Sequence, residues 1–352
     1  MQKMRYMAIK FNVISLTGYA FFIKKIRCFV LLPYLMLCPL YTEGQTNDLK
    51  SCTVPPLGDS SVREKGKVPS TLHDFKSISE DLSLILKQIP EKDLEDIRDL
   101  FSNFIYKNHF AYTLFGEKAV SLSCCIVSKP HEFKIPKKLK SNPSQIGDNT
   151  LGVKWEKWKC YQSLFSIKKY LIIEEMSWFS PYIKHILLIN KEQFVKVFNE
   201  NQAIFHRKLG SGVTGESLLA EVEKQGQLGS VIKHNELLFG ILLGYGKHNA
   251  ALYDKREHLQ LLYDQYKYVL VKNSPTIKDL DKQADGITDV LQPCGDYCYN
   301  LSTIPSTYFV ADPQSEETLV LKKKYQALRE KVSIIYAQDN VLEITLSTLI
   351  QD

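Results

Sequence analysis

The chain has 352 residues, of which 44% are hydrophobic, 24% charged and 11% aromatic, a composition typical of ordinary globular proteins. The net charge is +6, but residues 1–44 hold six basic residues against the single acid Glu43. The rest of the chain therefore carries 39 basic and 38 acidic side chains. A nucleic-acid-binding protein keeps its basic excess in the folded part, because it must neutralise phosphates there. We therefore expect no nucleic-acid partner.

The N-terminal segment predicts export. The basic cluster KKIR at 24–27 precedes an apolar run at 28–41, and a polar segment follows. This order is typical of a secretory signal peptide. The run is shorter than the roughly 20 apolar residues that a membrane span requires. We expect residues 1–44 to be a leader that directs the protein to the periplasm, the outer envelope or the exterior. An inner-membrane anchor formed by the N-terminus is the alternative.

The domain organisation follows from composition and element order. Residues 45–70 are rich in Pro, Gly, Ser and charge, which predicts a linker. Residues 71–352 then form one globular domain, and a subdivision near residue 190 is left open. Helical patterns come first, strand patterns follow, and helical patterns return, which favours an α+β fold over regular α/β alternation. The expected architecture is helix-rich with a small, mainly antiparallel sheet.

The first half of this domain combines helices with a short set of strands. Apolar residues at helical spacing predict two helices over 79–107, with Pro90 opening the second. Aromatic and β-branched residues then predict strands within 109–128. A loop follows over 131–150, and an amphipathic pattern predicts a short helix over 153–166. The clearest strand pair is predicted at 170–175 and 185–190.

The second half reads as mainly helical. The pattern is helical from Lys191 to about Tyr268, polar from there to about residue 306, and helical again over 315–337. The short apolar segment TYFVAD, at 307–312, precedes the last of these helices.

Residues 207–217, RKLGSGVTGES, have the glycine spacing of a phosphate-binding loop, but Glu216 replaces the lysine. Such a loop also needs a strand before it, whereas the preceding residues have helical periodicity. We therefore predict a helix that ends at Gly210 and a second helix capped by Thr214.

The most distinctive segment is 237–258, LLFGILLGYGKHNAALYDKREH. Gly240, Gly244 and His248 would share one face of a continuous helix, which predicts close packing of another element. The favoured interpretation is a core helix whose polar end reaches water. The alternative is a ligand-binding or catalytic cluster. Its candidate residues are Lys247, His248 and Asn249.

Metal and cofactor signals are incomplete. Residues 281–292 resemble a calcium loop, but Gln292 stands where a bidentate glutamate is required, so we predict a solvated acidic loop. Cys294 and Cys298 are separated by three residues instead of two. A local disulfide, two inert thiols, or a zinc site with Cys124 and Cys125 all fit this spacing. We expect no cofactor.

A lysine-rich region with two tryptophans could contact an anionic membrane surface, since cations attract headgroups and indoles favour the interface. The favoured interpretation is a solvated loop with tryptophans that pack inward. The residues concerned are Lys137, Lys138, Lys140, Trp155 and Trp158.

Three segments, 109–122, 237–250 and 311–325, resemble uncharacterised proteins of chlamydia-like intracellular bacteria. The resemblance extends over roughly residues 80–350. It implies an exported bacterial protein and supplies neither an activity nor functional residues. Motifs of metalloproteases, serine hydrolases, kinases and P-loop proteins are absent from the sequence. We therefore expect a binding role at the envelope or host interface. The alternative is a hydrolase or transferase with a site around 237–258.

Overall fold

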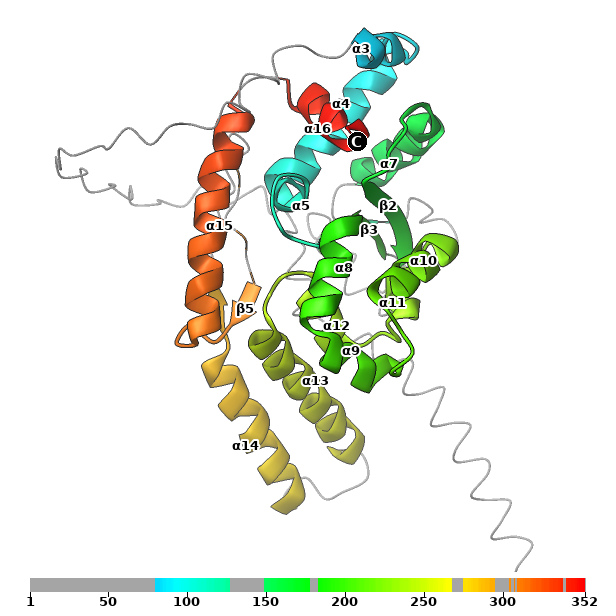
Figure 1. Ribbon diagram of the computed structural model, residues 1–352. Coiled ribbons are helices and arrows are strands. Elements are labelled where there is room, and N and C mark those ends of the chain that lie inside the picture. Colours follow the sequence, from blue (N-terminus) through cyan, green and yellow to red (C-terminus); the bar gives the residue numbers. More distant parts are fainter. Residues whose placement is uncertain are drawn as a thin grey trace, which may run out of the picture.

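The computed structural model describes residues 80–126, 149–177, 183–267, 275–294, 304, 307, 309–337 and 340–351. The predicted leader and linker lie outside these ranges. The fold is helix-rich α+β: two helical layers enclose a small antiparallel sheet, and a pair of helices projects from this body (Figure 1).

The sheet has three strands in the order β1-β3-β2. They span Val120–Ile126 (β1), Tyr170–Met176 (β2) and Ile183–Asn190 (β3). Both pairings are antiparallel, with Val120 opposite Ile189 and Tyr170 opposite Asn190. The central strand β3 is an almost continuous apolar run, because helices cover both of its faces. The hairpin predicted from 170–175 and 185–190 is confirmed.

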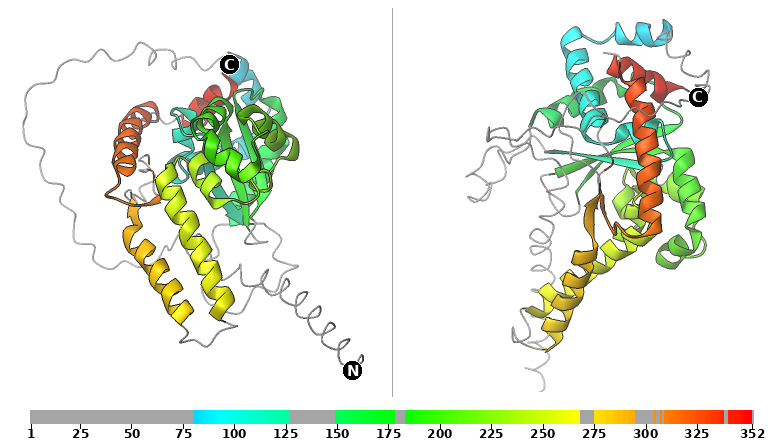
Figure 2. Two further views of the ribbon diagram at one scale, coloured as in Figure 1. Left: turned by 60° about the horizontal axis from the view of Figure 1, so that its bottom comes forward. Right: turned by 90° about the vertical axis from the view of Figure 1, so that its left-hand side faces the viewer.

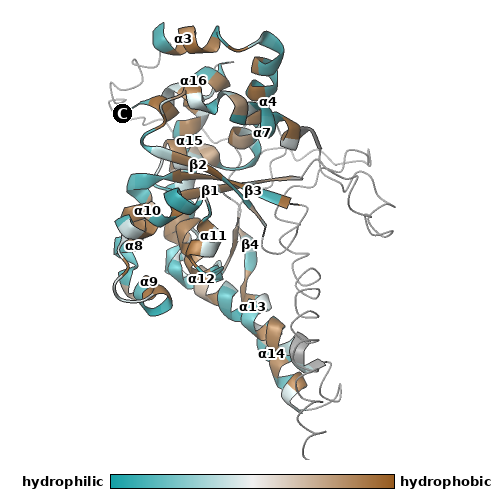
Figure 3. Ribbon diagram, turned by 90° about the vertical axis from the view of Figure 1, so that its right-hand side faces the viewer, coloured by the Kyte–Doolittle hydropathy of each residue, from teal (hydrophilic) through white to brown (hydrophobic). Residues whose placement is uncertain are grey.

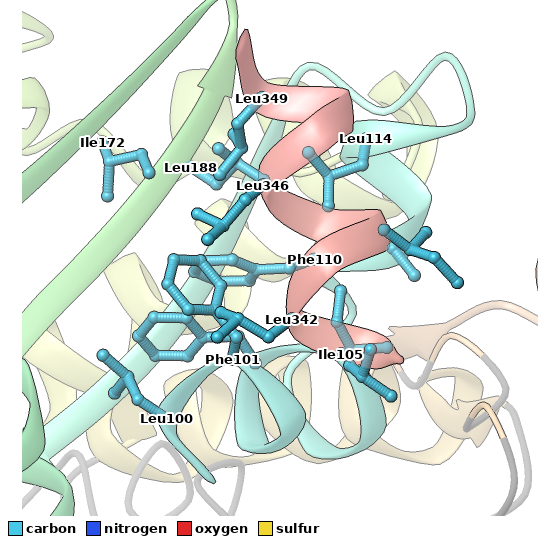
Figure 4. Packing of buried hydrophobic residues seen from close by; sticks show 14 of the residues in the cluster. Leu100, Phe101, Ile105, Phe110, Leu114, Ile172, Leu188, Leu342, Leu346 and Leu349 are labelled. Carbon is cyan, nitrogen blue, oxygen red and sulfur yellow. The ribbon is translucent and has the colours of Figure 1, made fainter. Parts of the chain in front are cut away.

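One face of the sheet packs against the N-terminal helices and the last helix (Figures 1 and 3). These elements are α3 (Glu80–Leu86), α4 (Glu91–Lys107), α5 (Phe110–Leu114), α7 (Asn149–Tyr161) with a 3-10 turn at Gln162–Leu164, and α16 (Val341–Ile350). Figure 4 shows Leu342, Leu346 and Leu349 of α16 directed into the core formed with α4 and α5. The C-terminal helix is therefore an integral part of the core.

The other face packs against the middle helices, which enclose a second apolar cluster. They are α8 (Lys191–Glu200), α9 (Gln202–Leu209), α10 (Gly215–Gln225), α11 (Leu228–Val231) and α12 (Glu236–Leu242). The prediction for 207–217 is confirmed: α9 ends at Gly210, and the Thr214 side chain accepts a hydrogen bond from Ser217 N at 3.1 Å. Ser217 Oγ in turn accepts from Thr214 N. This reciprocal cap satisfies two donors that would otherwise lack partners.

The remaining elements form the projecting part and one flank. They are α13 (Lys247–Lys267), α14 (Pro275–Val290), β4 (Gln292–Cys294), β5 (Phe309–Ala311) and α15 (Glu316–Ile335). The helices α13 and α14 extend side by side away from the body in all views (Figures 1 and 2). We call this pair the arm. At its base, β4 pairs antiparallel with β5, which leads into α15.

One expectation from the first half of the chain is wrong. Within the described residues 109–126, only Val120–Ile126 is a strand, since Phe110–Leu114 forms the short, wholly buried helix α5. The favoured interpretation of Trp155 and Trp158 is confirmed, because both indoles pack inward against α4 and neighbouring aromatic rings. The lysines proposed to accompany them, Lys137, Lys138 and Lys140, lie outside the described residues.

A second expectation, the acidic loop at 281–292, is also wrong. Residues up to Val290 belong to α14, whose helical backbone excludes the calcium-loop conformation. Ile277, Ala284 and Ile287 recur on one buried side of this helix, and the last two pack against α13. Within the described ranges, no helix is both long and apolar enough to span a bilayer.

Candidate functional site: the junction at the start of α13

The segment predicted as one helix is divided into α12 and α13 by a turn. Gly244 and Gly246 have φ values of +76° and +84°, which glycine adopts without steric cost. A Cβ atom would lie 2.3 Å from the Tyr325 hydroxyl at Gly244 and 2.5 Å from the Glu317 carboxylate at Gly246. The prediction of one continuous helical face is therefore wrong, and Gly240 alone of the predicted glycines lies within α12.

We use the term junction for the region where this turn meets β1 and α15. The junction brings together residues from 109–122, 237–250 and 311–325, the three segments that carry the resemblance noted in the sequence. Tyr325 donates a hydrogen bond to Gly244 O at 2.7 Å. The Tyr245 ring stacks on Phe309, with centroids 5.4 Å apart. These contacts attach the turn to α15 and to β5.

Asn249 joins α13 to α15 from a buried position. Its Nδ2 donates to Tyr245 O at 2.9 Å and to Thr318 Oγ1 at 3.0 Å. Its Oδ1 accepts from Asp312 N at 3.0 Å. The side chain is thus fully used in bridging the turn, the segment after β5 and α15. These bonds give Asn249 a structural role, since buried amide groups need such partners.

Lys247 and His248 contribute mainly through their backbone. Lys247 N donates to Glu317 Oε1 at 3.0 Å, and His248 N donates to Glu317 Oε2 at 2.8 Å. The carboxylate of one helix therefore caps another helix and complements the positive end of its dipole. The side chains of both residues are exposed, so the cap does not require their functional groups.

The His248 imidazole lies beside Asp312. Its Nε2 is 3.2 Å from Asp312 Oδ2. The pKa of Asp312 is lowered, first by the hydrogen bond that Gln314 N donates to it and then by His248. Of the three predicted residues, His248 alone has an exposed, titratable side chain that contacts an acid among the described residues.

Lys118 is the functional group at the junction that sequence reasoning missed. It is 4% exposed, and its amine lies 5.8 Å from the centroid of the Tyr245 ring. Burial lowers its pKa to about 7. Alternation along the strand held no signal for it, because Ala119, Val120 and Ser121 are buried on both faces.

A second cluster of polar side chains extends over the three strands of the sheet. Cys124 and Glu175 are the register partners of His185 on its two sides, and alternation places all three on the face that α11 covers. Glu175 Oε2 accepts hydrogen bonds from Leu228 N and Gly229 N at 2.7 and 2.9 Å. Burial raises the pKa of Glu175 and lowers that of His185 to about 4. The carboxylate therefore anchors the start of α11.

The structure describes only some of the cysteines named in the predictions. Cys294 is buried in β4, and Cys298 lies outside the described residues, so the disulfide between them stays a prediction. Neither Cys124 nor Cys125 is part of a disulfide. Across the described ranges, no group of three or more His, Cys, Asp or Glu side chains has an arrangement that could hold a metal ion.

The junction thus combines a structural brace, an exposed His–Asp pair and a buried lysine. No protein-family model, no curated protein and no solved structure matches the chain.

Proposed function

We propose that this is an exported bacterial protein that acts by binding a partner at the cell envelope or host interface, and that the arm is the binding element. The projection of α13 and α14 from the body carries this proposal (Figure 2). A helix of 21 residues is about 30 Å long, so the arm reaches well beyond the two-layered core.

The packing of the arm supports a role outside the core. The two helices share a small apolar cluster that includes Leu259, Ala284 and Ile287. Most other α14 side chains are exposed, among them Asp281, Asp285 and Asp289. This helix therefore offers most of its circumference for contacts with another molecule, with acidic groups spaced four residues apart.

The junction supports the same proposal because it fixes the base of the arm. Asn249 and Glu317 bond the first turn of α13 to α15. The strand β4, which follows α14, is paired with β5. Both ends of the arm are thus attached to the body, so the arm is held in one direction. A pre-oriented element loses less conformational entropy when it binds.

Site-specific photocrosslinking tests this proposal. A photoreactive residue at Asp285 of the full chain, expressed in the native bacterium and its host, is expected to form one discrete high-mass adduct. Charge reversal of the adjacent exposed acids, Asp281→Lys and Asp289→Lys, should abolish the adduct if it reports a specific partner. The matched control is reversal of two exposed acids of α4, Glu91→Lys and Glu95→Lys, and should leave the adduct unchanged.

One crosslinking result would contradict the proposal. If a photoreactive residue at Glu95 captures the same proteins as the one at Asp285, the arm has no special role. An N-terminal mass measurement on the same samples tests export separately. An intact Met1 in a protein recovered from the bacterial cytoplasm would exclude a cleaved leader.

The alternative function, a hydrolase or transferase with a site around residues 237–258, is favoured by one observation. Lys118 places a nucleophilic group type beside the Gly244–Gly246 turn.

A further inference from the structure

Lys118 is buried at the junction without a counter-ion among the described residues. Glu117, the adjacent acid, is exposed and pairs with Lys324 at 2.8 Å. Glu317, the acid beside the turn, accepts hydrogen bonds from the first two backbone N–H groups of α13. Burial lowers the pKa of Lys118. Both carboxylates are therefore committed elsewhere, and neither neutralises the amine.

Burial of an unpaired ammonium group is strongly unfavourable, whereas burial of a neutral amine is much less so. An ordinary lysine at neutral pH is unprotonated in fewer than about one molecule in a thousand. Lys118, with a pKa of about 7, is unprotonated in a large fraction of molecules at that pH. Desolvation by apolar surroundings is one of the ways in which proteins activate lysine as a nucleophile.

The surroundings hold the lysine stem and leave its amine beside an aromatic wall. A Cβ at Gly244 would lie 3.6 Å from Lys118 Cγ, so the backbone of the turn packs against the stem. The amine itself lies at the Tyr245 ring, which is half-buried and stacks on Phe309. Aromatic and apolar surroundings suit a small uncharged molecule better than an anionic one.

We propose that Lys118 forms an imine with small, uncharged aldehydes or ketones at the junction. The amine lone pair attacks the carbonyl carbon, which forms the C–N bond and places the electron pair of the carbonyl on oxygen. A proton passes from nitrogen to oxygen and gives the carbinolamine. Loss of its hydroxyl with the second amine proton releases water and forms the C=N bond. The step is a condensation, so it requires neither an oxidant nor a reductant.

The titratable groups that contact the neighbouring residue Glu117 or the Gly244–Gly246 turn have partners of their own. From α15, Tyr325 donates to Gly244 O, Lys324 pairs with Glu117, and Glu317 caps α13. From α8, Lys196 lies 3.9 Å from Glu117. Burial raises the pKa of Tyr325, so its hydroxyl remains protonated in the neutral range. Lys118 is therefore the group whose protonation should control the reaction near neutral pH.

Reductive trapping on the complete, unmodified protein tests the proposal. The probe is propionaldehyde with sodium cyanoborohydride, which reduces the imine to a stable propyl-lysine, and peptide mass mapping gives the rate at each lysine. At neutral pH, Lys118 should react at least about ten times faster than the exposed Lys247, because far more of it is neutral. Its rate should level off above its pKa of about 7.

Two results would overturn the proposal. One is a Lys118 that stays unmodified while Lys247 is labelled. The other is a Lys118 rate that keeps rising with pH as that of an ordinary lysine does. The substitution Lys118→Arg should remove the fast-reacting site, whereas Lys247→Arg should leave it intact. The pH profile uses the natural protein, so the test does not depend on whether either variant folds. It is also independent of the proposed binding role of the arm.

Discussion

Replacement of Lys118 by methionine is expected to stabilise the protein at neutral pH. Methionine keeps the unbranched shape of the side chain and removes the amine that must lose its proton on folding. With a folded-state pKa of about 7, the free energy of unfolding should rise on the order of 4 kcal/mol at pH 7. Denaturant unfolding of both proteins measures this difference.

The stability gained by Lys118→Met should depend on pH. Because burial lowers the pKa of Lys118, the unfolded chain binds a proton that the folded chain releases between about pH 7 and the ordinary lysine pKa. The natural protein therefore gains stability from this group as the pH rises through that window. The advantage of Lys118→Met should shrink to below roughly 1 kcal/mol by about pH 10. An advantage that is constant with pH would show that packing alone is responsible.

Truncation of a buried side chain in the C-terminal helix α16 should change the free energy of unfolding by a similar amount in the opposite direction. Leu346 is fully buried between α4, α5 and the sheet (Figure 4). Leu346→Ala removes apolar contacts and leaves a cavity, so the free energy of unfolding should fall by about 2–5 kcal/mol. The loss is measured as a shift of the denaturant midpoint between the two proteins, with the slope of the unfolding free energy against denaturant unchanged.

A matched control is available in the neighbouring helix α15. Ile334 is 60% exposed, and Ile334→Ala should change the free energy of unfolding by less than about 0.5 kcal/mol. Equal losses for the two substitutions would contradict the placement of α16 in the core.

Local sequence patterns were sufficient to predict elements whose apolar residues keep a single helical or extended period and whose ends carry clear capping or polar residues. The hairpin of β2 and β3 was predictable because its apolar strands are short and bounded by polar residues. The helix α10 was predictable because Thr214 supplies a side-chain cap and Gly210 ends the preceding helix. In each case the decisive interactions are local, so the sequence alone contains them.

The missed elements depend on distant contacts. The helix α16, VLEITLSTLI, is buried on nearly all sides and therefore lacks an amphipathic period. The helix α14 carries a calcium-loop pattern of acids, but burial of Ala284 and Ile287 against α13 decides its conformation. Such choices are made by tertiary packing, which outweighs weak local propensities.

The candidate site was located in part and for the wrong reason. Sequence reasoning selected Lys247, His248 and Asn249 as neighbours on a helix. The structure shows that Asn249 and two backbone N–H groups brace the junction. Lys118 was missed because its neighbours at the turn and on α15 are more than a hundred residues away along the chain. Only the fold reveals that this lysine has no acidic partner among the described residues.

The most direct test of the account is an NMR titration of the Lys118 amine in the natural, full-length protein. Lysine labelled with ¹³C at Cε reports the protonation of each amine, and Lys118→Arg identifies the signal by its disappearance. We expect this signal to titrate with a pKa of about 7. A Lys118 signal that titrates at the ordinary lysine value, near 10.4, would contradict the account, because the amine would then be charged and solvated in the folded protein.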